Sequence, residues 1–304
     1  MDQILRQLSK IKIKARIVSC SHLKDLQKEL QGLRVQGGIS EEFYYCRLSQ
    51  FQFEVPQSLP EAKTLIIAAF PQPTIVIILN LDGQRFPVKI PPTYLYYSDD
   101  LIQKFLEAML NPLGYRIAKS SLPLKLLAVR SGLGRYGRNN ICYVPGLGSY
   151  HRLVAFFSDY PATVDSWGPA RMANFCRTCQ ICLNICPTGA IRPNKFLISA
   201  ERCLTYMNEG ETDFPVWLNN MAHNAVVGCL RCQEACPQNF KIKDSIFSCG
   251  EFTEVESRIL LESGKLDVNK MPQLLQDKLG SLNFVDYLGI LSRNLRALIN
   301  TFQL

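Results

Sequence analysis

Eight of the twelve cysteines follow a spacing that suits iron–sulfur chemistry. The first run reads CRTCQICLNICP and gives the pattern C-x2-C-x2-C-x3-C-P, formed by Cys176, Cys179, Cys182, Cys186 and Pro187. With this spacing three thiolates surround one face of a four-iron, four-sulfur cubane, and the fourth cysteine binds a neighbouring cluster. The run therefore predicts two clusters.

A second, shorter run lies about 40 residues further on and completes the ligand sets. It reads C-x2-C-x3-C-P and lacks one cysteine, which Cys203 can supply from between the two runs. The simplest assignment gives the first cluster Cys176, Cys179, Cys182 and Cys236, and gives the second cluster Cys186, Cys203, Cys229 and Cys232. Zinc is the alternative metal because C-x2-C pairs also bind zinc, although zinc motifs rarely show three short steps that end in Cys-Pro.

The other four cysteines, Cys20, Cys46, Cys142 and Cys249, have no nearby partner in the sequence. Isolated cysteines are often buried, so we expect these four to pack in the core. The N-terminus lacks the apolar core and cleavage site of a signal peptide, which predicts a cytoplasmic protein with reduced thiols. No apolar stretch approaches the roughly 18 residues of a membrane span, so no membrane partner is expected.

The composition is that of a folded globular protein, with 304 residues, 47% hydrophobic and 20% charged. The formal net charge is +8, from 34 basic and 26 acidic residues. Two clusters with eight thiolate ligands would lower this to about +4. The basic balance is therefore a weak indication of an anionic partner.

Hydrophobic patterns predict a mixed α/β fold. Residues 64–70 and 74–81 read as buried central strands, and residues 101–110 as an amphipathic helix. We expect Ser98 to cap that helix, with Asp99 and Asp100 facing the positive end of its dipole. A catalytic carboxylate is the alternative role for either aspartate. Residues 250–304 read as helices.

A glycine-rich segment, SGLGRYGRNN, begins at Ser131. Its glycines let backbone amides approach a ligand, and Arg135 and Arg138 suit a phosphate. Gly132, Gly134 and Gly137 spell G-x-G-x-x-G, but no acidic ribose partner follows about 20 residues later, so a dinucleotide site is not predicted.

Three features together resemble the epoxyqueuosine reductase family, which is related to the reductive dehalogenases: SGLGRYGRNN, the eight-cysteine order with its isolated Cys203, and the ending RNLRALI. The resemblance implies an α/β (α+β) cobalamin-binding domain, a bacterial double-cluster ferredoxin-like domain and a short C-terminal helical tail. On this basis we expect domains at 1–164, 165–247 and 248–304. The residues that would line the corrin are Ser131, Gly132, Leu133, Gly134, Arg135, Tyr136, Gly137, Arg138 and Asn139.

The chain departs from the family where the catalytic acid is expected. The family has Arg-Asp-Tyr-His before a helix, whereas this chain has YYSDD from Tyr96. Asp99 and Asp100 are therefore shifted candidates, and the phenol of Tyr136 is a further candidate proton donor. No D-x-H-x-x-G motif is present to supply a histidine to cobalt, because His22, His151 and His223 all lack that spacing.

The predicted function is that of an iron–sulfur oxidoreductase in which two clusters reduce a bound cobalamin that acts on an unidentified substrate. One alternative is an electron-transfer or corrinoid-reducing partner without its own substrate. Another is an epoxyqueuosine reductase that acts on tRNA, for which the C-terminal helices look shortened. A ferredoxin or flavodoxin is the expected electron donor.

Overall fold

The computed structural model describes residues 3–95, 97–262 and 266–302. The chain forms two compact units, each built from two stretches of sequence. Unit 1 comprises Met1–Gln72 and Tyr96–Gln180, and unit 2 comprises Pro73–Leu95 and Ile181–Leu304. Among the described residues, no helix is long and apolar enough to cross a membrane.

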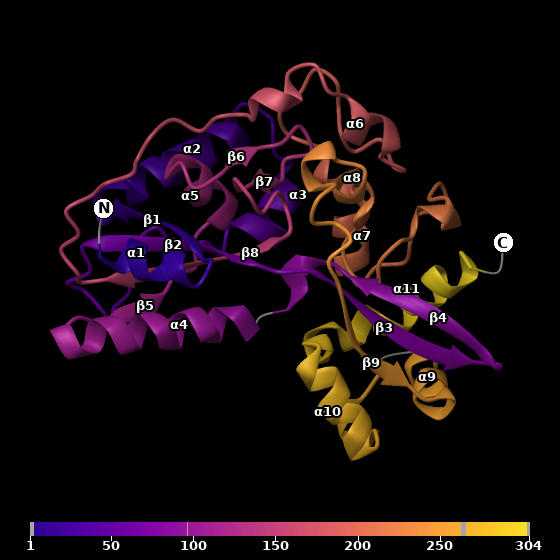
Figure 1. Ribbon diagram of the computed structural model, residues 1–304. Helices are drawn as coiled ribbons and strands as arrows, with labels where there is room; N and C mark the ends of the chain where they lie inside the picture. The colour runs from indigo at the N-terminus through magenta and orange to yellow at the C-terminus, as the bar shows by residue number, and fades with distance from the viewer. Residues whose placement is uncertain (1–2, 96, 263–265, 303–304) are drawn as a thin grey trace. The chain divides into compact units, whose positions relative to one another are not determined.

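Unit 1 is organised around an antiparallel sheet with the strand order β1-β2-β8-β5 (Figure 1). The strands are β1 (Lys14–Ser19), β2 (Thr64–Pro71), β8 (His151–Ser158) and β5 (Ile117–Lys119). The register places Ile66 opposite both Ile17 and Phe156, which makes β2 a central strand. The strand predicted at 64–70 is thereby confirmed.

Helices cover both faces of this sheet, which explains why β2 is apolar without alternation. Leu65 and Ile67 point into one core with α2 and α5, and Ile66 and Ala68 point into the opposite core with α1 and α4. The helices of unit 1 are α1 (Gln3–Lys10), α2 (Leu23–Val35), α3 (Glu41–Phe43), α4 (Tyr97–Leu110) and α5 (Leu124–Arg130). Since side chains of a strand point alternately to the two faces, the positions 65–70 of β2 all need an apolar residue.

The amphipathic helix predicted at 101–110 is confirmed as part of α4. Ile102, Leu106 and Leu110 recur every four residues and are fully buried. The expected cap is wrong, because the helix already begins at Tyr97 and Ser98 lies inside its first turn. The Ser98 hydroxyl is instead buried and donates to Oε1 of Gln72 at 3.2 Å.

Unit 2 contains a three-stranded sheet with the order β4-β3-β9. Its strands are β3 (Thr74–Leu81), β4 (Gln84–Ile90) and β9 (Ile246–Phe252). The strand predicted at 74–81 is confirmed as the central one. Strand β9 pairs in parallel with β3, and the sequence did not reveal it because IFSCGEF shows no regular alternation of apolar and polar residues and is mostly exposed.

The C-terminal helices pack on this sheet and confirm the predicted helical tail (Figure 1). They are α9 (Glu254–Leu261), α10 (Gln273–Ser281) and α11 (Leu288–Asn300). Thr253 and Glu256 form a capping box that begins α9. The hairpin β3–β4 shares one core with these helices, whereas the sequence placed residues 73–95 in an N-terminal domain. The division at 164 and 247 stays a prediction.

Candidate metal centre

The four cysteines assigned to the second cluster all lie in unit 2. They lie next to three short helices, α6 (Ile181–Ile185), α7 (Leu204–Glu209) and α8 (Arg231–Glu234). Cys186 follows α6, Cys203 precedes α7, Cys229 precedes α8 and Cys232 lies within α8. Helices α6 and α8 contact each other, so the two cysteine runs fold together as the spacing requires.

Three of these thiols act on one another electrostatically. Burial raises the pKa of Cys229 to about 11; hydrogen bonds from Asn224 and the Arg231 amide oppose the rise, and the negative charges of Cys203 and Cys186 contribute to it. Burial also raises the pKa of Cys203, and Cys186 adds to that rise. Like charges raise each other's pKa only at short range, so Cys186, Cys203 and Cys229 lie near one another. Binding to iron would remove the unfavourable repulsion between their thiolates.

Hydrogen-bond donors surround the same sulfur atoms. Burial opposes ionisation of Cys186, but the backbone amides of Ile191, Thr188 and Ala190 outweigh it, so the pKa of this thiol is lowered. Asn224 Nδ2 donates to Cys229 Sγ at 3.2 Å, and Asn224 Oδ1 accepts from the amide of Leu230 at 2.7 Å. Donors aimed at sulfur stabilise the negative charge of a bound cluster.

Helix α11 supports the chain that leads to Cys229. The Asn294 side chain is buried and donates to the carbonyls of Asn208 and Val226, both at 2.8 Å. Gly228 has φ +66°, and a Cβ there would lie 2.5 Å from the Tyr94 hydroxyl. The segment RNLRALI, which carries part of the family resemblance, therefore positions the loop that leads to Cys229.

The ligands assigned to the first cluster are divided between the units. Cys176 and Cys179 belong to unit 1, and Cys182 and Cys236 belong to unit 2. Among the residues that the structure describes, no three His, Cys, Asp or Glu side chains converge on a single-ion site. Ligands of a cubane each bind a different iron atom, so they need not converge on one point as zinc ligands do.

The glycine-rich segment forms a small hairpin in unit 1, made of β6 (Arg135–Tyr136) and β7 (Cys142–Tyr143). A Cβ at Gly134 would lie 2.5 Å from Cys142 Sγ, and one at Gly137 would lie 2.5 Å from the Tyr143 ring. These two glycines are therefore required by packing within the hairpin. Of the nine residues expected to line a corrin, Gly132 and Arg135 are exposed, Arg138 is half-buried and the others are buried.

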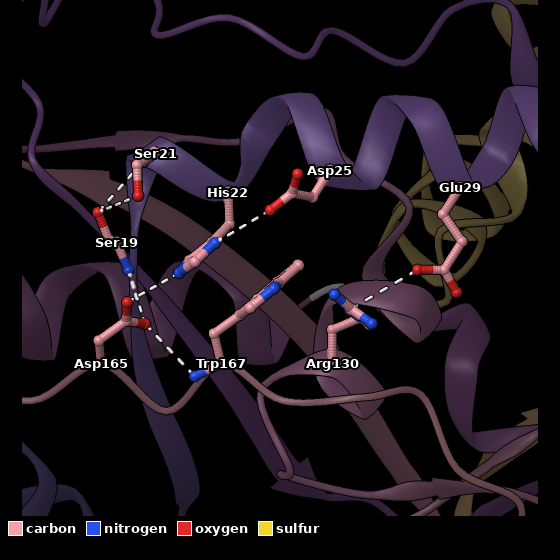
Figure 2. Close-up of polar contacts among 8 residues, drawn as sticks. All are labelled: Ser19, Ser21, His22, Asp25, Glu29, Arg130, Asp165 and Trp167. Carbon is pink, nitrogen blue, oxygen red and sulfur yellow. Dashed lines mark hydrogen bonds and ion pairs between the residues drawn. The ribbon is translucent and has the colours of Figure 1, made fainter.

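The segment between β8 and Cys176 has little regular structure but is held to unit 1 by a stack of side chains (Figure 2). The His22 ring stacks on Trp167 with centroids 4.4 Å apart, and the Arg130 guanidinium lies 4.5 Å from the Trp167 ring. His22 Nε2 lies 2.8 Å from Asp165 Oδ2, and Asp165 Oδ1 accepts from the amide of Ser19 at 3.2 Å. The polypeptide therefore approaches the first cysteine run from an anchored position.

The two candidate aspartates differ sharply in their surroundings. Arg152 binds Asp99 in a bidentate pair at 3.0 and 3.1 Å, and Lys119 Nζ lies 3.2 Å from Asp99 Oδ2. The Asp99 carboxylate is almost completely buried and is used in these ion pairs, which favours a structural role. Asp100 is exposed. The catalytic assignment of either residue stays a prediction.

Burial also decides the state of Tyr136 and of the isolated cysteines. Burial, followed by the charges of Cys142 and Glu29, raises the pKa of Tyr136, which keeps the phenol protonated at neutral pH. Burial raises the pKa of both Cys20 and Cys142 to about 12, which suits inert core thiols. Cys249 also packs against a core. The expectation was wrong for Cys46, which is exposed.

Comparison with known proteins agrees with the cysteine analysis. Residues 175–239 match the family described as the 4Fe-4S double cluster binding domain. The prediction of a double [4Fe–4S] module is thereby confirmed.

Proteins of similar sequence include several epoxyqueuosine reductases. An epoxyqueuosine reductase of Pseudomonas aeruginosa is 36% identical over 137 residues, which are 44% of this chain and 37% of that protein. One of Leadbetterella byssophila is 30% identical over 152 residues, 48% of each chain. The chain resembles epoxyqueuosine reductases. The matched region spans less than half the length of these two relatives.

Solved structures of epoxyqueuosine reductases share the fold. The Bacillus subtilis structure has a TM-score of 0.70 at 19% identity, and covers 99% of this chain and 81% of its own. A structure with an epoxyqueuosine-modified tRNA stem loop has a TM-score of 0.63 at 20% identity, and covers 95% of this chain and 77% of its own. The predicted mixed α/β fold with its cluster domain and C-terminal helix is confirmed.

The cysteine ligands were visible in the sequence, but their hydrogen-bonding partners were not. Asn224 carried no signal in the sequence, since it is one of several asparagines in an irregular stretch. Asn294 belongs to the segment RNLRALI, but nothing in the sequence indicated its hydrogen bonds to the carbonyls of Asn208 and Val226. A side chain that acts by donating a hydrogen bond across the fold can be recognised only once the fold places it.

Replacing Asn224 by Leu should lower the reduction potential of one cluster. The change removes the Nδ2 donor to Cys229 Sγ, and donors to sulfur favour the more negative, reduced cluster. If the hydrogen bond stabilises the reduced cluster by about 1 kcal/mol more than the oxidised cluster, its loss lowers the potential by roughly 40 mV for a one-electron step. EPR-monitored redox titration would measure it, with exposed Asn220→Leu as the control. Two unshifted potentials would contradict the role of Asn224.

Replacing Asp99 by Asn should destabilise unit 1, because Arg152 would lose its carboxylate partner in a buried setting. Breaking a buried pair costs about 3–5 kcal/mol, and we expect the lower end of this range because Arg152 is 20% exposed. For a chain of this size we expect the thermal midpoint to fall by roughly 5–10 °C. Asp100→Asn is the matched control. Equal midpoints for the two variants would show that the ion pairs contribute little.

Proposed function

We propose that the protein is an iron–sulfur oxidoreductase that passes electrons through two [4Fe–4S] clusters to a cobalamin held by unit 1, which reduces an unidentified substrate. The observation that carries the proposal is the set of mutually interacting thiols Cys186, Cys203 and Cys229, with hydrogen-bond donors aimed at their sulfur atoms. Such donors and charges set the potential of a cluster, which is what an electron-transfer module requires.

The case for cobalamin combines the resemblance with two features of unit 1. Gly132 and Arg135 are the exposed residues of the glycine-rich segment. A Cβ at Gly132 would meet no atom within 4 Å, so the backbone there is open to a ligand. Of the nine residues that the resemblance implies, these two are the ones that we propose to contact the corrin first.

Bound cobalamin would supply a strongly reducing, nucleophilic metal centre. The protein would contribute the binding surface and the proton. Tyr136 is a protonated phenol at neutral pH, while Asp99 is engaged by Arg152 and Lys119. We therefore propose Tyr136 before Asp99 as the proton donor, with exposed Asp100 as the alternative.

We propose the electron donor and the substrate only as classes of molecule. A ferredoxin or flavodoxin would suit clusters of this type as the donor. The relatives named epoxyqueuosine reductase, and the one solved with a tRNA stem loop, favour tRNA as the substrate to test. Without cobalamin, the alternative is an electron-transfer partner whose unit 1 binds another molecule.

Anaerobic purification followed by iron and sulfide analysis and a cobalamin titration tests the proposal. We expect about eight irons per chain, because each of the two cubanes holds four. We also expect a saturable change in the corrin absorption spectrum. Eight irons with no corrin response would overturn the cobalamin step and leave an electron-transfer protein.

Whether tRNA is the substrate is tested with the same preparation, by measuring the affinity of the protein for tRNA at increasing salt concentration. A phosphate-binding surface loses affinity steeply as salt rises, because bound counterions are released on association. Binding of tRNA that weakens in this way would support the tRNA substrate. Absence of binding at low salt would remove it and leave a small molecule as the substrate class.

A further inference from the structure

Arg138 lies in the glycine-rich hairpin, where the sequence suggested a contact with phosphate. Its guanidinium instead donates to backbone carbonyls of the first cysteine run. Nη2 lies 2.8 Å from the Cys176 carbonyl and 3.3 Å from that of Arg177, and Nε lies 3.0 Å from the Cys179 carbonyl. The backbone amide of Arg138 also donates to Cys176 Sγ at 3.4 Å.

The rest of the hairpin joins the same stretch of chain. The amide of Tyr136 donates to the carbonyl of Arg171 at 3.0 Å, and the amide of Ala173 donates to the carbonyl of Tyr136 at 2.8 Å. The ring of Tyr143 meets Phe175 edge-on with centroids 5.5 Å apart. The hairpin is therefore a rigid platform beside the Cys176 turn, and Arg138 extends from it.

The chemistry of this contact requires arginine. A planar guanidinium directs several N–H groups at fixed angles, so one side chain can hold three carbonyls of one turn, whereas a lysine ammonium acts as a point charge on a flexible stem. Backbone carbonyls need hydrogen-bond partners, and three carbonyls of the turn between Cys176 and Cys179 accept from Arg138. Arg138 supplies those partners and a positive charge.

We infer that Arg138 is a positioning residue for the first cluster, which holds the Cys176–Cys179 turn in its ligating conformation and raises the potential of that cluster. The inference rests on the cluster assignment within the proposed function and on no property of cobalamin. It also assigns to the glycine-rich hairpin a second role, as the support for a cluster ligand.

The test compares Arg138→Ala and Arg138→Lys with Lys125→Gln in the anaerobically purified holo-protein. Lys125 is the control because its Nζ donates to the Asn140 carbonyl of the same hairpin at 3.3 Å. Iron content, the rate of iron loss to a chelator and the potentials of both clusters are measured. Total iron in the unaltered protein checks separately that both clusters are present.

We expect Arg138→Ala to lose about half of the iron, since each cubane holds four of eight atoms, or to keep both clusters with one potential shifted negative. Arg138→Lys retains the positive charge but loses the planar set of N–H donors. We therefore expect it to lose iron about fivefold faster than Lys125→Gln does. If Arg138→Ala does not fold, the rate of iron loss from Arg138→Lys tests the inference. Native iron content, iron-loss rate and potentials in the arginine variants would overturn the inference.

Asn224→Leu provides an internal reference. Its partner Cys229 is assigned to the second cluster, whereas the partners of Arg138 are assigned to the first. Changes at independent sites add, so the double variant should show both shifts, one on each cluster. Both variants shifting the same cluster would overturn the assignment of Arg138 to the first cluster.

Discussion

Sulfur ligands that are brought together in a protein interior repel one another as thiolates, and the protein must offset that repulsion before and after iron binds. Cys186, Cys203 and Cys229 illustrate the problem, since burial and their neighbours' charges raise the pKa of two of them. Iron supplies most of the compensating charge. Backbone amides and the Asn224 side chain supply the rest.

Much of the surrounding structure positions the cysteine ligands and the groups that donate hydrogen bonds to them. In unit 2, buried Asn294 of α11 holds the carbonyls of Asn208 and Val226, on either side of the loop that carries Asn224. In unit 1, the hairpin β6–β7 and the Trp167 stack hold the chain that carries Cys176. Residues around the ligands thus determine both the geometry and the potential of a metal site.

The sequence predicted those parts of the structure that depend on local spacing. The double-cluster module followed from the positions of the cysteines, and the strands at 64–70 and 74–81 followed from unbroken apolar runs that only central, covered strands need. It could not predict β9, because that strand depends on parallel pairing with β3, more than 160 residues away. Nor could it predict that Arg138 binds carbonyls or that Arg152 and Lys119 engage Asp99, because long-range polar contacts leave no periodic pattern.

The central claim is that Cys203, isolated in the sequence, completes a second four-iron cluster with Cys186, Cys229 and Cys232. The most direct measurement is iron content with EPR of the reduced Cys203→Ser protein, prepared anaerobically beside the unaltered chain. The account predicts loss of about four irons, or a second cluster with an altered signal, while the first cluster's signal remains. Eight irons with two unchanged cluster signals would contradict it.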